Sequence, residues 1–100
     1  MLKHIVMWRF KEGACGMSRQ DHALWMKEHL EALPAIIPEI QSLEFGINET
    51  ASAAAYDAAL TVTFRSKEDL ETYKNYPAHQ AVSNHCKEVR EARVVVDYFL

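Results

Sequence analysis

The chain has 100 residues, of which 49% are hydrophobic and 25% charged, and its net charge is −3. These values are typical of a globular protein, and we expect residues 1–100 to form a single domain around one core. The acidic balance and the scattered basic residues argue against binding to nucleic acid or to an anionic membrane surface.

The sequence also lacks the usual signals of export or membrane insertion. No apolar stretch approaches the roughly 20 residues that a membrane span needs. The first residues, Met1 to Val6, show neither the apolar core nor the cleavage pattern of a signal peptide. Cys15 and Cys86 are too few for a disulfide framework, so we expect free thiols. We therefore expect a cytoplasmic protein.

The first part of the chain predicts a strand followed by a helix. Residues 3–10 alternate between two faces, as a strand does. A glycine-containing loop follows, and Ser18 with Asp21 resembles a capping box that starts a helix at the next turn. We expect this helix to run to about Leu33, where Pro34 interrupts it.

The middle of the chain predicts two strands and a short helix. Residues 40–48 and 58–65 alternate as strands, and small and polar residues form a hairpin-like loop between them. Ser66 repeats the capping signal, which predicts a short helix to about Asn75.

The last part predicts a helix from Pro77 to about Glu91 and a β-branched strand over residues 93–99. The complete order is β-α-β-β-α-β, with the second helix broken at Pro77. This order predicts a ferredoxin-like α+β fold, in which helices cover one face of an antiparallel four-stranded sheet.

Both faces of the predicted strands carry apolar side chains. Ile5 and Met7 lie opposite Val6 and Trp8 on the first strand, and the last strand is apolar on both faces as well. A sheet with one face in water should alternate with polar residues instead. We therefore expect the second face to pack on the sheet of another copy, which predicts a homodimer.

The stretch from Tyr73 to His79 is the strongest candidate for chemistry. Pro77 suits the first turn of a helix, which places His79 where the helix dipole favours a neutral imidazole. A neutral imidazole beside a phenol could act as an acid–base pair. Asp97 could accept a hydrogen bond from the imidazole and fix its tautomer. Alternatively, Tyr73 and His79 only pack and cap, and Asp97 pairs with Arg93 at the sheet edge.

The first helix carries two histidines on its apolar face. His22 and His29 lie close to Trp25 and Met26 on this face and could line a pocket between helix and sheet. The alternative is that they bond to the backbone or lie at a dimer contact. They are too far apart along the helix to share a metal ion, so we expect no metal site. Trp25 is expected to face Trp8, either in the core or as a pocket wall.

Five segments spread along the whole chain carry a more specific pattern. They are the strand from Lys3 to Phe10, the segment from Ile37 to Gly46, Tyr56-Asp57, Tyr73 with Pro77-Ala78-His79, and the closing Val95-Val96-Asp97-Tyr98. In these segments the chain resembles the stress-responsive A/B barrel family, also called Dabb. The resemblance implies a dimeric α/β barrel in which two ferredoxin-like sheets pack together with their helices outside.

The resemblance also implies a candidate activity. A plant polyketide cyclase of this family works without a cofactor and closes a linear poly-β-keto thioester by an aldol reaction. Its general base matches His79 and its partner tyrosine matches Tyr73, while a first-strand histidine and a last-strand carboxylate match His4 and Asp97. The implied function is a cyclase-like lyase that needs no cofactor and acts on a small carbonyl-rich or aromatic substrate.

Two other functions stay open at this stage. The dimeric barrel also resembles the cofactor-independent antibiotic-biosynthesis monooxygenases, which implies oxygenation of an activated phenol as a second enzymatic option. The chain could instead be a non-catalytic oligomeric stress protein or a ligand-binding protein. An enzyme predicts a solvent-connected cavity with His79 and Tyr73 pointing into it, whereas a structural protein predicts that neighbours satisfy His79.

Overall fold

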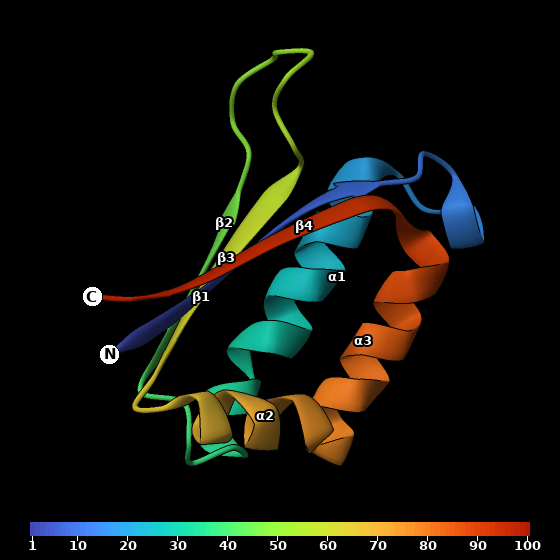
Figure 1. The fold of residues 1–100 in the computed structure, drawn as a ribbon. Helices are drawn as coiled ribbons and strands as arrows, with labels where there is room; N and C mark the ends of the chain where they lie inside the picture. The colour runs from blue at the N-terminus through green and yellow to red at the C-terminus, as the bar shows by residue number, and fades with distance from the viewer.

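One antiparallel sheet carries the fold, and three helices cover one of its faces (Figure 1). The computed structural model describes residues 1–100. The strand order in the sheet is β2-β3-β1-β4, with every neighbouring pair antiparallel, which confirms the predicted ferredoxin-like α+β fold. The strands are β1 (Leu2–Phe10), β2 (Ser42–Ile47), β3 (Ala58–Phe64) and β4 (Arg90–Phe99), and the helices are α1 (Arg19–Glu31), α2 (Lys67–Asn75) and α3 (Pro77–Val89).

Serine caps explain where α1 and α2 begin. The Ser18 hydroxyl accepts a hydrogen bond from the Asp21 N–H at 3.1 Å, and the Asp21 carboxylate accepts one from the Ser18 N–H at 3.4 Å. This reciprocal pair is the predicted capping box. At α2, the Ser66 hydroxyl accepts from the Asp69 N–H at 3.1 Å. None of the helices is long and apolar enough to cross a membrane.

The last helix and the last strand meet earlier than the sequence predicts. α3 ends at Val89 rather than near Glu91, and β4 begins at once with Arg90. The cause is pairing, because Arg90 already lies opposite Phe10 where the register of β1 shifts. The other predicted elements form with small shifts at their ends. The early start of β4 brings Arg90 into the sheet, beside α3.

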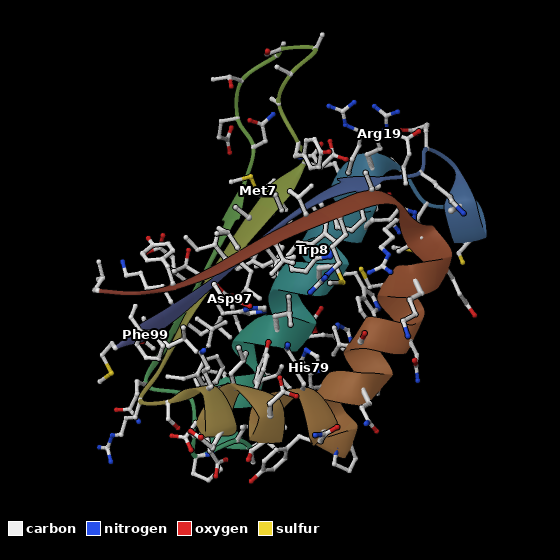
Figure 2. The ribbon with its side chains drawn as sticks, in the orientation of Figure 1. Met7, Trp8, Arg19, His79, Asp97 and Phe99 are labelled. Atoms are coloured by element: carbon white, nitrogen blue, oxygen red, sulfur yellow. The ribbon has the colours of Figure 1, made fainter.

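The two faces of the sheet differ in what covers them. The inner face packs against the helices, and its buried side chains include Leu2, His4, Val6, Trp8 and Phe10 of β1 and Leu60, Val62 and Phe64 of β3. The outer face has no helix on it (Figure 1). Its apolar side chains include Met7, Val94, Val96 and Tyr98, all exposed in the protomer. Figure 2 shows Met7 pointing away from the helices.

His22 of α1 is a buried polar residue without a hydrogen-bond partner. Its side chain is 1% exposed, and neither ring nitrogen has a partner. The ring packs 6.0 Å from the ring of Phe10, measured between centroids. His22 therefore lies in the core and makes no hydrogen bond to the backbone, unlike either sequence-based alternative. A buried polar group without a partner costs about 1–3 kcal/mol.

Replacing His22 by leucine should therefore stabilise the fold by about 1 kcal/mol, because it removes the unpaired polar group and keeps a similar volume. Urea denaturation monitored by circular dichroism measures the free energy of unfolding. His29→Leu is the matched control on the same helix, since the Nδ1 of His29 bonds to the Trp25 carbonyl at 2.8 Å. A His22→Leu variant less stable than the wild type would contradict the prediction.

Candidate functional site

The site forms where the chain turns from α2 into α3. Tyr76 lies between α2 and α3 in an extended conformation, with φ −63° and ψ 133°, and Pro77 follows as the first residue of α3. A residue that precedes proline rarely adopts the helical conformation, which explains why the helix breaks at Tyr76. The turn brings the ring of Tyr73 in α2 to 4.3 Å from the ring of His79 in the first turn of α3. The predicted position of His79 is confirmed.

His79 is held in a defined orientation between α3 and the sheet (Figure 2). Its Nδ1 lies 3.3 Å from the carbonyl oxygen of Lys74, so Nδ1–H donates and Nε2 keeps its lone pair. Burial lowers the pKa of His79 below its usual 6.5, and the nearby positive charges of Arg93 and Lys74 act in the same direction, as does His4. The ring is therefore neutral at pH 7.

Tyr73 supplies a buried hydroxyl that no protein group satisfies. Its side chain is 0% exposed, and its hydroxyl has no hydrogen-bond partner. Burial raises the pKa of Tyr73 well above its usual value, so the phenol stays protonated. The hydroxyl can therefore donate a hydrogen bond to a group that enters the space around it.

His4 and Asp97 form the second polar pair of the site. They lie directly opposite each other on β1 and β4, and His4 Nδ1 is 2.5 Å from Asp97 Oδ1. Burial lowers the pKa of His4, while the bond to Asp97 partly opposes this effect. The sequence interpretation that Asp97 bonds to the His79 imidazole is wrong, and so is its alternative pairing with Arg93. The strand register decides the partner, and the register was not readable from the sequence.

A small internal cavity lies between these side chains. Its volume is about 40 Å³, enough for about one or two water molecules, and His4, Tyr73 and His79 all line it. Trp8 and Met26 also line it, as the sequence analysis expected. The cavity adjoins a wider groove of about 610 Å³, and both are lined by His4, His79, Ser83, Arg90 and Arg93.

Trp25 and His29, which were predicted at the pocket, lie elsewhere. Trp25 stacks between the rings of His29 and His85, at centroid distances of 3.7 and 3.8 Å, and does not face Trp8. Neither Trp25 nor His29 lines the cavity. The cause is the rotation of α1, which directs Met26 toward the sheet and Trp25 toward α3.

The sequence analysis missed several residues that line the cavity. Arg90 and Arg93 of β4, together with Ser83 and the free thiol Cys86 of α3, belong to this group. Arg93 lies opposite the inward-facing Trp8, and because this pairing depends on the strand register, the sequence alone contains no signal for it. The histidines, cysteines and carboxylates of the chain form no cluster of three or more that could hold a metal ion.

The pairing of His4 with Asp97 predicts that one substitution changes the pKa of His4 and not that of His79. Asp97→Asn should lower the pKa of His4, because the Asp97 charge and hydrogen bond raise it, and should leave the pKa of His79 nearly unchanged. Histidine ring signals followed by NMR as a function of pH measure both values. Glu91→Gln, a charge change elsewhere on β4, is the control. A larger shift at His79 than at His4 would contradict the observed pair.

Comparisons with known proteins place the chain in a family. A dimeric protein of unknown function from Bacteroides fragilis is 30% identical, with TM-score 0.81 over 99% of this chain and 95% of that chain. A dimeric ferredoxin-like protein from Thermobifida fusca is 25% identical, with TM-score 0.84 over 99% and 90%. A hydroxynitrile lyase from Passiflora edulis, at 22% identity and TM-score 0.83 over 99% and 92%, shares the fold.

No curated protein matches the sequence. The model of a family described as the stress responsive A/B barrel domain, or Dabb, matches residues 2–100. The chain belongs to the stress responsive A/B barrel domain family.

Proposed function

We propose that this protein is a cofactor-free, cyclase-like enzyme that removes a proton from a carbon next to a carbonyl group. The observation that carries this proposal is the cavity shared by a neutral imidazole and an unpaired phenol, those of His79 and Tyr73. A base and a hydrogen-bond donor around one small space are the two groups that enolate formation requires.

Each group has a role in the proposed reaction. Nε2 of His79 takes the proton from the carbon, and the electron pair of the C–H bond moves to form an enolate. The Tyr73 hydroxyl donates a hydrogen bond to the enolate oxygen, where negative charge develops. The enolate carbon then attacks a second carbonyl of the same substrate and forms a ring. The new alkoxide takes a proton back from His79, which restores the neutral base.

The His4–Asp97 pair supports the proposal as a positioning device. The Asp97 carboxylate accepts from Nδ1–H of His4, so the Nε2 of His4 has no proton and can accept a hydrogen bond from the substrate. The ring of His4 lies 6.2 Å from that of Tyr73 and meets it edge-on. In this proposal His4 accepts a hydrogen bond from a hydroxyl or enol group of the substrate and Asp97 fixes the tautomer of His4, while His79 and Tyr73 act on the reacting carbonyl.

Enzymes of more than one class share this fold. Besides the hydroxynitrile lyase, an antibiotic biosynthesis monooxygenase matches with TM-score 0.77 at 14% identity, which is a likeness of fold alone. The unpaired Tyr73 hydroxyl favours an enzyme or ligand-binding protein over an oligomeric structural protein, because a purely structural site would gain stability by pairing that group.

The first test is hydrogen exchange at carbon. In D₂O, the protein should catalyse the incorporation of deuterium at the carbons next to the ketone of 4-oxopentanoate. Proton NMR measures the rate of this exchange. His79→Gln should slow the catalysed exchange at least about 100-fold, and Tyr73→Phe should slow it about tenfold or more. His85→Gln, the same substitution on the same helix but outside the cavity, should leave the rate unchanged.

The pH dependence follows from the lowered pKa of His79. The exchange rate should be level around pH 7 and fall only when the pH drops below the pKa of His79, because protonation removes the base. No catalysed exchange with 4-oxopentanoate or with neutral 1,3-diketones would contradict the enzymatic proposal and leave the ligand-binding function.

We also propose that residues 1–100 act as one domain and pair with a second copy through the outer face of the sheet. The support is the exposed apolar strip on β1 and β4, which includes Met7 and Val96 at 43% and 53% exposure. Structures similar to this chain are described as dimeric. A charge at the centre of a self-complementary contact would face its own copy.

Val96→Lys should therefore convert the dimer to a monomer, measured by sedimentation velocity. Leu24→Lys is the matched control, since Leu24 is 50% exposed but lies on α1, on the other side of the sheet. A Val96→Lys protein that stays dimeric would contradict this contact, as would a Leu24→Lys protein that becomes monomeric.

A further inference from the structure

The wide groove beside the cavity is lined entirely by polar side chains, four of them lysine or arginine. It runs between α3 and β4 and has a volume of about 610 Å³. No carboxylate and no apolar side chain lines it. The lining residues are His4, Lys74, His79, Gln80, Ser83, Asn84, Lys87, Arg90 and Arg93.

The register and the helix period explain how these residues meet. Gln80, Ser83, Asn84 and Lys87 recur along one side of α3, while Val82 and Cys86 face the core. Arg93 lies opposite Trp8 and so belongs to the inner face of β4. The two elements form the two walls of the groove, and the cavity with His79 lies at its inner end.

Three of the four lysine and arginine charges of the groove have no carboxylate partner. Within 4 Å, no carboxylate pairs with Lys87, Arg90 or Arg93, and Lys74 pairs only with the exposed Glu71, at 3.4 Å. The chain as a whole has a net charge of −3, so this concentration of positive charge is not an average property of the surface. Unpaired guanidinium groups beside a groove can bind the oxygens of an anion in pairs.

Arg93 connects the groove electrostatically to the site. Its positive charge acts on His4, Tyr73 and His79: it favours the neutral forms of the two histidines and partly opposes the rise that burial causes in the pKa of Tyr73. Arg93 therefore lies within Coulombic reach of all three groups that surround the cavity. A ligand bound to Arg93 would have its next atoms at the entrance to that cavity.

We propose that the groove between α3 and β4 binds an anionic oxygen group of the substrate, a carboxylate or a phosphate, through Arg93, Arg90 and Lys87. The carbonyl end of the same molecule then enters the cavity lined by Tyr73 and His79. This inference rests on the proposed function, and it assigns the substrate class as anionic carbonyl compounds. The cavity alone, at about 40 Å³, holds only the reacting atoms, so the remainder of the substrate occupies the groove.

The test compares a charged ligand with its neutral counterpart. Binding of 4-oxopentanoate and of methyl 4-oxopentanoate is measured by calorimetry and by NMR shifts of the Ser83 and Asn84 amides. The acid should bind at least about tenfold more tightly than the ester, as expected for hydrogen bonds to a charged group. Equal affinity of the acid and the ester would overturn the proposal.

Substitutions locate the charge that matters. Arg93→Gln and Lys87→Gln should each weaken binding of the acid, Arg93→Gln by about tenfold, and neither should weaken binding of the ester. Arg65→Gln is the matched control, because Arg65 is an exposed arginine outside the groove. If Arg65→Gln weakened binding of the acid as much as Arg93→Gln does, the anion would bind elsewhere and the proposal would fail.

Inorganic phosphate distinguishes the two sources of the anion. Competition between phosphate and 4-oxopentanoate would support a site for either anion, and binding of 4-oxopentanoate without competition would support a carboxylate site. The exchange reaction separates this proposal from the function it rests on. If the protein binds the anion but catalyses no exchange, the anion site stands and the proposed enzymatic function is rejected. If it catalyses exchange of the acid and of the ester at equal rates, the enzymatic function stands and the anion site is rejected.

Discussion

The extended conformation of Tyr76 before Pro77 is the local constraint on which the site depends. If α2 continued into α3 as one helix, Tyr73 and His79 would lie almost two turns apart along a single axis. The break instead lets α3 start in a new direction, so the phenol and the imidazole meet at 4.3 Å. Because the proline has no N–H to lose at the first helical position, this turn costs little stability. The site is thus built from an ordinary property of the residue pair.

Burial of the polar groups of the site lowers the stability of the folded protein. Burial disfavours the charged forms of His4 and His79, and no protein group pairs with the Tyr73 hydroxyl. The ring nitrogens of His22, which lies in the core away from the cavity, also have no hydrogen-bond partner in the protein. The difference lies in access: Tyr73 lines a cavity that adjoins a groove, so in the proposed function a ligand would pair with its hydroxyl. His22 is buried against Phe10 and lines neither the cavity nor the groove.

Local and long-range features were not equally predictable from the sequence. The helix starts at Ser18 and Ser66 and the first-turn position of His79 depend on neighbouring residues, and all were confirmed. The partner of Asp97 depends on the register of β1 against β4, and the contacts of Trp25 depend on the rotation of α1 against α3. Tertiary packing sets both the strand register and the helix rotation. A shift of one residue in the register, or the equivalent rotation of the helix, would change every side-chain contact of that element. For the same reason, Arg93 received no role until its position opposite Trp8 was known.

The distribution of charge also limits what net charge can predict. An acidic chain with scattered basic residues gives no reason to expect an anion site, and it still argues against a polyanion such as nucleic acid. The fold nevertheless places Lys87, Arg90 and Arg93 around one groove. In the proposed reaction, the same positive field that attracts a substrate anion would also stabilise negative charge on an enolate oxygen near Tyr73. Because Arg93 acts on the groove and on the cavity, binding and proton removal would share one electrostatic source, and loss of that charge would weaken both.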